Sequence, residues 1–356
     1  MQENGLFFSA NIDDFGNEVI SVSFHQSNLN KFTQYFDFYA PGQFGVKDIL
    51  ILNGNLYVSY VRELEHNCFN TSVLKAELSE VLDFSMLYSP EECIKRDKLE
   101  KFNAHQSGGR MYAYKDNKIL ITIREYKSRL QAQDLSSDFG KIMVIDAFSG
   151  EDILISMGHR NPQGLYYSNK YDDIWSTDHG PFGGDELNRH PSPEIGKIEN
   201  YGWPIASYGA HYGSGSYEKS GSKLVLIEDR KNYRYKKAPL YKSHEKHGFV
   251  EPLLHFSPSV GISQVIEIDT KFAQDQSSRA LMLGTMGYAV TDFTPSLSLF
   301  ILSLNPSNQI IERKQIIMNE RIRDLIYDPA KDDIYFSGDS NAIIGKISYC
   351  DDKSNC

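Results

Sequence analysis

Short apolar runs separated by polar turns recur along most of the chain. Residues 19–24 read VISVSF, residues 118–123 read KILITI, and residues 297–304 read LSLFILSL. Runs rich in Val, Ile, Leu and Phe, bounded by turn residues, predict β-strands. Some of them are joined in pairs by Asn-Gly or Asp-Asn turns, as in ILILNGNLYVSYV at 49–61, which predicts β-hairpins.

Stretches with helical periodicity are scarce. The best helical candidate is residues 89–102, SPEECIKRDKLEKF. Many short antiparallel strands without long helices predict an all-β sandwich, barrel or propeller. A loosely repeated phrase, in which a strand, a polar turn and an aromatic strand follow one another, favours repeated blades. It is found near residues 46–61, 110–123, 164–177 and 323–337.

The composition argues against several classes of protein. The formal net charge is −10, and no sustained Lys/Arg stripe is present, which argues against a nucleic-acid-binding protein. No apolar run reaches the length of a membrane span, and no signal peptide is visible at the N-terminus. The cysteines, Cys68, Cys93, Cys350 and Cys356, form no CxxC pair, so zinc is not expected. Their even number permits two disulfides, and the last two could close a small loop.

The densest cluster of polar turn residues lies between Gly158 and Pro204, which contains GHRNPQG, STDHGPFGGDELN and NYGWP. In the first motif, Arg160 offers a permanent charge and a fixed fork of donors that suits an anionic ligand. Asn161 and Gln163 offer directional hydrogen bonds. A polar turn that caps a strand explains the same residues without any ligand.

The second motif combines a sharp turn with carboxylates. Gly180 and Pro181 bend the chain and expose backbone carbonyls, and Asp185 and Glu186 follow. Ca²⁺ prefers oxygen ligands of this mixed kind. The spacing is not that of an EF-hand, and a solvated turn explains the motif equally well.

Two further places carry candidate chemistry. His105 precedes a predicted strand, where a histidine can act as a general base, although a lone histidine is more often structural. Arg321 and Arg323 are two positions apart on a predicted strand, so their side chains share one face. A ligand carrying carboxylates would satisfy both guanidinium groups. Ion pairing with Glu320 or Asp324 is the alternative.

Taken in order, these segments resemble the signature of the soluble quinoprotein glucose and aldose-sugar dehydrogenases, the glucose/sorbosone dehydrogenase family. The resemblance covers about Gly42 to Ser348, most of the chain. Besides the three motifs above, it rests on GQFGVKDI at 42–49, HQSGGRM at 105–111, AQDLSSDFGKIMVI at 132–145 and RIRD at 321–324.

The resemblance implies a six-bladed β-propeller, built as a single domain over residues 1–356. Residues 1–41 would form a degenerate or incomplete first blade, and residues 209–248 a long loop excursion. The implied cofactors are pyrroloquinoline quinone (PQQ) and Ca²⁺, and the implied reaction oxidises the anomeric hydroxyl of an aldose to give a lactone. The partners would be the sugar and an external electron acceptor. A monomer or homodimer in the periplasm or secreted is expected.

The resemblance also implies roles for individual residues. His105 would take the proton of the anomeric hydroxyl while hydride passes to PQQ, and Arg160 would stabilise charge on the reduced quinone. Asn161 and Gln163 would bind the cofactor, and Gln43 would lie near the substrate.

The other implied roles concern calcium and the PQQ carboxylates. The backbone carbonyls of Gly180 and Pro181 would hold the calcium ion of the cofactor. Arg321 and Arg323 would face the carboxylates of PQQ. The residues at positions associated with further calcium binding are Asp185, Glu186 and Tyr201.

The chain departs from the family pattern at several positions. Gly287 stands where several members place a lysine that grips the quinone. Arg124 and Glu125 replace the Gly and Asp of a turn, and Ala104 precedes the histidine where the glucose-specific branch carries Asp. These changes keep open an alternative function, a redox-inactive calcium-binding propeller that acts as a binding module. A hydrolytic propeller of the sugar-lactonase type fits the order of the motifs poorly.

Overall fold

Strands make up nearly all the regular structure. The structure, a computed structural model, describes residues 7–14, 20–33, 45–96, 104, 108–180, 183–193, 196–209, 216–220, 223–227, 240–241, 244–273, 277–287, 297–340 and 343–349. The chain forms two compact units. Unit 1 is Met1–Asn161 with Ile195–Ile198, and unit 2 is Pro162–Glu194 with Glu199–Cys356. A single domain over the whole chain stays a prediction.

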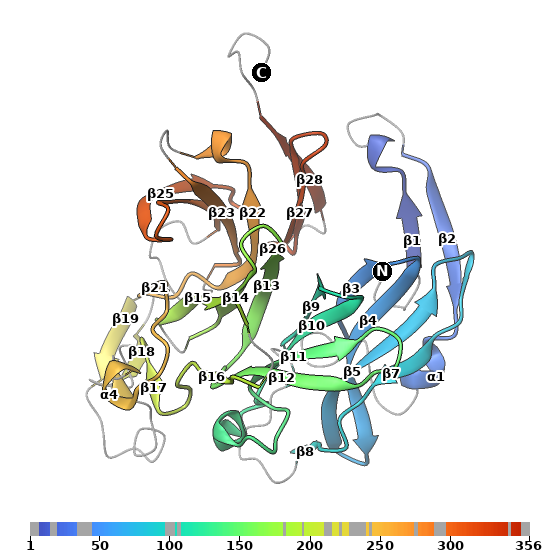
Figure 1. The fold of residues 1–356 in the computed structure, drawn as a ribbon, viewed down its shortest axis with the longest axis horizontal. Coiled ribbons are helices and arrows are strands. Elements are labelled where there is room, and N and C mark those ends of the chain that lie inside the picture. Colours follow the sequence, from blue (N-terminus) through green and yellow to red (C-terminus); the bar gives the residue numbers. More distant parts are fainter. Residues whose placement is uncertain are drawn as a thin grey trace. The chain divides into compact units, whose positions relative to one another are not determined.

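Unit 1 contains successive sheets whose strands are mostly antiparallel neighbours in sequence (Figure 1). The first sheet consists of β1 (Phe7–Ala10), β2 (Val22–Ser27) and β6 (Val81–Leu82). The second consists of β3 (Val46–Leu52), β4 (Asn55–Glu65), β5 (Cys68–Glu77) and β7 (Ser85–Tyr88), and β8 (Ile94–Lys95) also pairs with β5. The third contains β9 (Gly108–Tyr114), β10 (Lys118–Ile123), β11 (Lys141–Asp146) and β12 (Asp152–Met157). The short helical segments are α1 (Asn30–Thr33), η1 (Ile12–Asp14) and η3 (Arg129–Gln133).

Unit 2 repeats this plan. Its first main sheet consists of β13 (Pro162–Ser168), β14 (Asp173–Asp178), β15 (Asp185–Pro191) and β21 (Leu254–Phe256). The second consists of β22 (Ile262–Ile268), β23 (Arg279–Thr285), β24 (Ser298–Leu304) and β25 (Ile310–Ile317). The third consists of β26 (Ile322–Asp328), β27 (Asp333–Gly338) and β28 (Ile343–Ser348). The shorter elements are β16 (Glu199–Asn200), β17 (Ala206–Ser207), β18 (Ser216–Ser220), β19 (Lys223–Ile227), β20 (Leu240–Tyr241), α4 (His244–His247) and η4 (Thr270–Phe272).

The strand and hairpin predictions are confirmed. Residues 49–61 form β3 and β4, which pair in antiparallel register. The turn between them uses Asn53 and Gly54, both with positive φ, at 48° and 73°. That backbone matches the twist of the flanking strands and suits an Asn-Gly pair.

The helix predicted for 89–102 is wrong over its described part. Ile94–Lys95 is strand β8, paired with β5, and a disulfide joins Cys93 to Cys68. The side-chain amide of Asn70 donates to the carbonyls of Pro90 and Glu92 at 2.8 and 3.3 Å. These bonds take carbonyls that the first turns of a helix would have used.

The core of each unit forms because sheets stack face to face. Side chains alternate between the two faces of a strand. In unit 1, Tyr57 and Val61 of β4 pack with residues of β10 and β11, whereas Val58 and Tyr60 pack with Phe7 and Leu29. A strand buried on both faces reads as a continuous apolar run, which explains the sequence pattern at 55–61.

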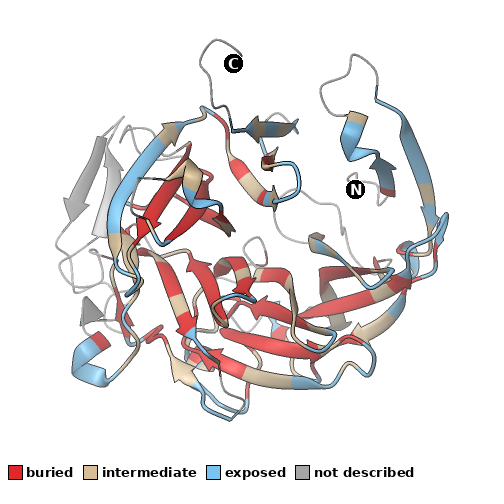
Figure 2. Ribbon diagram, turned by 45° about the horizontal axis from the view of Figure 1, so that its top comes forward, coloured by how far each residue is buried: buried red, intermediate tan, exposed pale blue. Residues whose placement is uncertain are grey.

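Unit 2 shows the same arrangement at β23. Leu281 and Leu283 join a cluster with Trp175, whereas Ala280 and Met282 join a cluster with residues of β26 and β27. All residues of β23 and β24 are buried, but β25 at the edge is mostly exposed. Figure 2 shows this contrast between buried and exposed strands.

Two segments singled out in the sequence are described only in part. Of residues 1–41, the structure describes β1, β2 and α1. Of residues 209–248, it describes Gly209, the short strands β18 to β20 and α4 with Gly248. The predictions of a degenerate first blade and of a long loop excursion otherwise lie outside the described residues.

A buried ion-pair network joins two sheets of unit 2. The guanidinium of Arg279 binds both oxygens of Asp173, at 2.7 and 2.8 Å, and one oxygen of Glu267 at 2.7 Å. Arg189 donates to Asp173 at 2.7 Å, and the indole N–H of Trp175 donates at 3.0 Å. Asp173 is completely buried, so each of its hydrogen bonds offsets part of a large desolvation cost.

We expect Asp173→Asn to lower the free energy of unfolding by about 3–5 kcal/mol, because it leaves a buried arginine without its bidentate partner. Urea denaturation measures the change. The matched control is Glu65→Gln, which removes an exposed carboxylate 3.8 Å from Lys95 and should change stability by at most about 1 kcal/mol. Equal effects for the two variants would contradict a stabilising role for the network.

Candidate functional site

Two of the sequence motifs meet within unit 1. Asp48 of GQFGVKDI forms an ion pair with Arg110 of HQSGGRM, with Nη1 and Oδ1 at 3.2 Å, and both side chains are 8% exposed. The other oxygen of Asp48 accepts the backbone N–H of Met111 at 2.7 Å. A buried pair with an additional hydrogen bond fixes the start of β9 against β3.

The glycines of HQSGGRM permit this close approach. Gly109 has φ of +86°, and a Cβ there would lie 2.6 Å from the Cβ of Lys47. Lys47 in turn donates through Nζ to the carbonyl of Ala104 at 3.3 Å. Ala104 immediately precedes His105, so β3 anchors the backbone that leads into this residue. His105 and Gln43 themselves lie outside the described residues.

The GHRNPQG turn rests on the AQDLSSDFGKIMVI motif. The backbone N–H groups of Gly158 and His159 donate to the carbonyls of Ala132 and Gly140, at 2.9 and 3.1 Å. The His159 ring and the Ser156 hydroxyl are hydrogen-bonded at 2.8 Å. A Cβ on Gly140 would lie 2.5 Å from the Cβ of Ala132. The two motifs therefore form one packed element.

This element positions the predicted anion-binding residues of unit 1. Arg160 is partly buried in the turn, and Asn161 beside it is completely buried. A buried amide next to a guanidinium can orient a planar polar ligand. Gln163 is partly buried on β13, in unit 2.

In unit 2, the carboxylate of Asp185 holds two loops together. Its Oδ1 accepts the N–H of Gly180 at 3.0 Å and the hydroxyl of Ser259 at 2.9 Å. Its Oδ2 accepts three successive backbone N–H groups, those of residues 260–262, at 3.0, 2.7 and 3.2 Å. A carboxylate offers about four lone-pair directions. Binding a metal ion through Asp185 would therefore require one of these donors to leave.

The same contacts set the position of the Gly180 carbonyl. A Cβ on Gly180 would lie 2.0 Å from the carbonyl oxygen of Gly184, so only glycine fits this turn. Gly183, with φ of +101°, donates to Ser259 at 2.8 Å. Pro181 lies outside the described residues.

Glu186 and Asp178 are directly paired across β14 and β15, so two carboxylates of like charge lie close together. Burial, and secondly the negative charge of Asp178, raise the pKa of Glu186 well above its usual value. Such a pair favours a bound proton or cation. The two predicted calcium-binding carboxylates therefore differ. Glu186 has a raised pKa that a bound cation would lower, whereas Asp185 accepts hydrogen bonds that hold the loops together.

Tyr201, the third residue assigned to further calcium binding, is almost fully buried. Its single hydroxyl proton faces two acceptors, the carbonyl of Arg189 at 3.0 Å and Glu199 at 3.1 Å. Burial, and secondly the charge of Glu199, raise its pKa. Its phenol is already engaged, so a metal ion would reach this residue through the backbone.

Arg321 and Arg323 converge on one carboxylate. Nε of Arg321 and Nη2 of Arg323 lie 3.1 and 3.4 Å from the two oxygens of Asp339. Burial acts to raise the pKa of Asp339, but the charge of Arg323 and the hydrogen bond from Arg321 leave it below its usual value. The partner anticipated for this pair was Glu320 or Asp324. The partner found is Asp339, on the turn after β27, which pairs with β26.

The partly exposed Asp339 shows that this arginine pair fits a carboxylate-bearing group. The position where the family pattern places a lysine is occupied by a glycine in this chain. Gly287 has φ of +69° and donates to the carbonyl of Val260, and its own carbonyl would lie 2.6 Å from a Cβ on Gly261. A side chain at 287 would be strained there.

Sequence reasoning missed the residues that support these sites. Asp339 and the segment from Ser259 to Gly261 were not anticipated, although small residues between two strands in SPSVGIS were a weak signal of close backbone approach. Among the residues that the structure describes, no three His, Cys, Asp or Glu side chains lie close enough to hold a metal ion. No described helix is long and apolar enough to cross a membrane.

Comparison with known proteins places the chain in a family. The family model for Glucose / Sorbosone dehydrogenase matches residues 19–230, and the chain belongs to this family. It is similar to aldose sugar dehydrogenase YliI of Escherichia coli, with 27% identity over 225 residues. That match spans 57% of this chain and 57% of that relative, so little more than half of the relative's length is matched.

Solved structures share the fold. A glucose dehydrogenase is similar over 87% of this chain and 84% of its own, with a TM-score of 0.64 and 23% identity. The PQQ-bound form of aldose sugar dehydrogenase from Streptomyces coelicolor is similar over 90% and 79%, with a TM-score of 0.56 and 16% identity. These similarities confirm the predicted fold class, an all-β six-bladed β-propeller.

Asp185→Asn should loosen both loops that the carboxylate joins, since an amide presents an N–H₂ group to one set of N–H donors. Losing a hydrogen bond to a charged group costs about 1.5–3 kcal/mol, so amide exchange of Gly180 and of residues 260–262 should accelerate at least about tenfold. Hydrogen exchange measures this, with the amides of β24 as the internal control. Unchanged exchange at these residues would refute the assignment.

Glu186→Gln should change how stability depends on pH. Because the fold raises the pKa of Glu186 above its usual 4.5, the bound proton stabilises the folded state below that pH. This stabilisation is lost as the pH rises through the higher, folded-state pKa. In metal-free buffer the variant should therefore gain stability relative to the wild type as the pH rises from 4.5 through the raised, folded-state pKa of Glu186. A constant difference in urea midpoint over this range, as expected for the exposed control Glu312→Gln, would contradict this.

Proposed function

We propose that the chain is a quinoprotein oxidoreductase that uses PQQ and Ca²⁺ to oxidise the anomeric hydroxyl of an aldose sugar to a lactone. The observation that carries the proposal is the arginine pair, because Arg321 and Arg323 already grip a carboxylate and PQQ carries several. Family membership and the names of the similar proteins, an aldose sugar dehydrogenase and a PQQ-bound form of such an enzyme, support it.

We assign the following roles to residues of the chain. PQQ, when bound, supplies a quinone that accepts hydride from the sugar. His105 takes the proton of the anomeric hydroxyl, and Gln43 contacts the sugar. Arg160 stabilises negative charge on the cofactor, and Asn161 and Gln163 form hydrogen bonds to it.

Calcium binding is assigned to the Gly180 turn and its neighbours. The backbone carbonyls of Gly180 and Pro181 hold the calcium ion of the cofactor, and Asp185 keeps the turn in place through its hydrogen bonds. Glu186 and the backbone of Tyr201 form the further calcium site. A cation beside Glu186 would relieve its repulsion with Asp178 and favour the ionised carboxylate.

The remaining assignments follow the same proposal. The disulfide between Cys68 and Cys93 supports a periplasmic or secreted location, because such bonds persist in oxidising compartments. The partners are a sugar and an external electron acceptor, and the chain works as a monomer or homodimer.

A second candidate is a propeller that binds calcium but no quinone and acts as a binding module. Gly287 favours it, since the lysine that grips the quinone in several relatives has no counterpart at this position, where the left-handed backbone suits glycine. Calcium binding without quinone binding would select this candidate.

Calorimetric titration with PQQ in calcium-containing buffer should show saturable binding, and the loaded protein should reduce an electron-accepting dye when aldoses are added. Arg323→Gln should weaken PQQ binding at least about tenfold, since a hydrogen-bonded ion pair contributes about 1.5–3 kcal/mol. Arg313→Gln, the same change at an exposed arginine on β25, should leave binding unchanged. Absence of PQQ binding by the wild type would overturn the proposal.

His105→Ala should abolish sugar oxidation while PQQ binding and thermal stability stay close to those of the wild type, because a general base is needed only for turnover. Dye reduction, calorimetry and thermal denaturation measure the three quantities. Retained turnover, or loss of the fold, would instead mark His105 as a residue without a catalytic role.

A further inference from the structure

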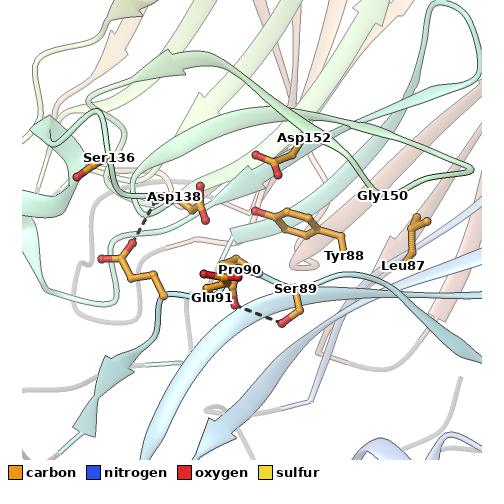
Figure 3. Close-up of a pocket in the computed structure, with 10 residues that line it drawn as sticks. Leu87, Tyr88, Ser89, Pro90, Glu91, Ser136, Asp138, Gly150 and Asp152 are labelled. Atoms are coloured by element: carbon orange, nitrogen blue, oxygen red, sulfur yellow. Dashed lines mark hydrogen bonds between the residues drawn. The ribbon is translucent and has the colours of Figure 1, made fainter.

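A cavity of about 430 Å³ lies in unit 1, away from every motif used so far except the AQDLSSDFGKIMVI segment (Figure 3). It is bounded by residues 87–92 at the end of β7 and after it, by the segment before β11, and by the turn leading into β12. Its lining includes the carboxylates of Glu91, Glu92, Asp138 and Asp152. Among the described residues that line it, there is no lysine, arginine or histidine.

None of the described residues that line this cavity pairs its carboxylates with a cation. Burial, and then the negative charges of Asp152 and Glu92, raise the pKa of Asp138 to about 6. Burial also raises the pKa of Asp152. The neighbouring ammonium is that of Lys141, but its Nζ donates to the carbonyls of Gln131 and Phe139 at 2.7 and 2.8 Å. No ion pair joins it to Asp138.

A buried hydroxyl group marks the interior of the cavity. Tyr88 is only 4% exposed, and its hydroxyl forms no hydrogen bond with any described residue. In Figure 3 its phenol points toward the side where Asp138 and Asp152 lie. A buried hydroxyl without a partner is costly, so a ligand that forms hydrogen bonds there would remove this cost.

The walls are rigid before any ligand arrives. The disulfide at Cys93 and the amide of Asn70 fix the segment that carries Glu91 and Glu92. Glu92 accepts the hydroxyl of Ser137 at 2.7 Å, which ties this segment to the loop carrying Asp138. On the opposite side, a Cβ on Gly150 would lie 2.0 Å from the carbonyl oxygen of Leu87. Preorganised walls reduce the entropic cost of binding.

We propose that this cavity is a binding site for a primary alkylammonium group, either of a free diamine or of a lysine side chain presented by another molecule. The ammonium donates to the carboxylates of Asp138 and Asp152 and to the oxygen of Tyr88, and its alkyl stem lies along Leu87 and Pro90. The cavity is much larger than a bare metal ion, and the described carboxylates are not clustered closely enough for metal coordination.

The test is calorimetric titration of the full chain, without PQQ, with butane-1,4-diamine at low salt and about pH 7.5. We expect saturable binding, and none with butan-1-ol, which keeps the stem but lacks the charge. Asp138→Asn with Asp152→Asn should weaken binding at least tenfold. Asp116→Asn, the same change at an exposed hairpin residue whose positive φ suits asparagine, should not weaken it.

Tyr88→Phe separates a binding role from a structural one. Because the hydroxyl has no protein partner, its removal should leave the melting temperature unchanged or raise it, yet weaken diamine binding severalfold. This variant also keeps the test decisive if the double aspartate variant fails to fold. Lowering the pH through about 6 should weaken binding as Asp138 takes up a proton.

A capped lysine peptide distinguishes the two sources of the ammonium group. Tighter binding of the peptide points to a protein partner, and tighter binding of the diamine points to a free metabolite; either supports the site. No binding of either probe overturns the proposal, and so does equal affinity of the wild type and of both the Tyr88 and the double aspartate variants. Binding of calcium chloride in preference to the diamine also overturns it.

Discussion

The hydrogen bonds to the carboxylate of Asp185 are the constraint on which the candidate calcium site depends. One oxygen holds the turn at Gly180 and the other holds the backbone of residues 260–262. Gly180 lies outside β14 and β15, so these hydrogen bonds determine where its carbonyl group lies. Asp185 thus orients the backbone at Gly180, and the neutral carbonyl oxygen there is available to bind a cation.

Close backbone approach makes these contacts possible. Gly109, Gly140, Gly180 and Gly261 each lie where a Cβ would meet a neighbouring atom at less than 3 Å. Each belongs to a segment that joins two motifs or two loops. The glycines of the signature therefore serve packing, and the polar residues beside them are placed by that packing.

The sequence pattern predicted most of the strands because their cause is local. A strand buried on both faces, such as β4, must be apolar at nearly every position, and an Asn-Gly turn selects a hairpin. The helix expected at 89–102 failed because a disulfide to Cys68 and the amide of Asn70 decide the backbone there, and both partners are distant in the sequence. Local propensity carries no information about such contacts.

The candidate site was predictable only through its motifs. Two side chains complete it: Asp339 binds the arginine pair, and Ser259 binds Asp185. Both lie on turns, and the stacking of the sheets decides which residues these turns contact. The glycine at 287, which departs from the family pattern, suits the left-handed backbone found there, which packs on Gly261. Loss of one cation need not abolish quinone binding if the arginine pair supplies the charge.

A crystal structure of the chain grown with PQQ and calcium would test the account most directly. We expect Arg321 and Arg323 to leave Asp339 for the carboxylates of the cofactor, with calcium on the carbonyl of Gly180. A structure from saturating PQQ in which the arginines still bind Asp339 and no quinone is present would contradict it.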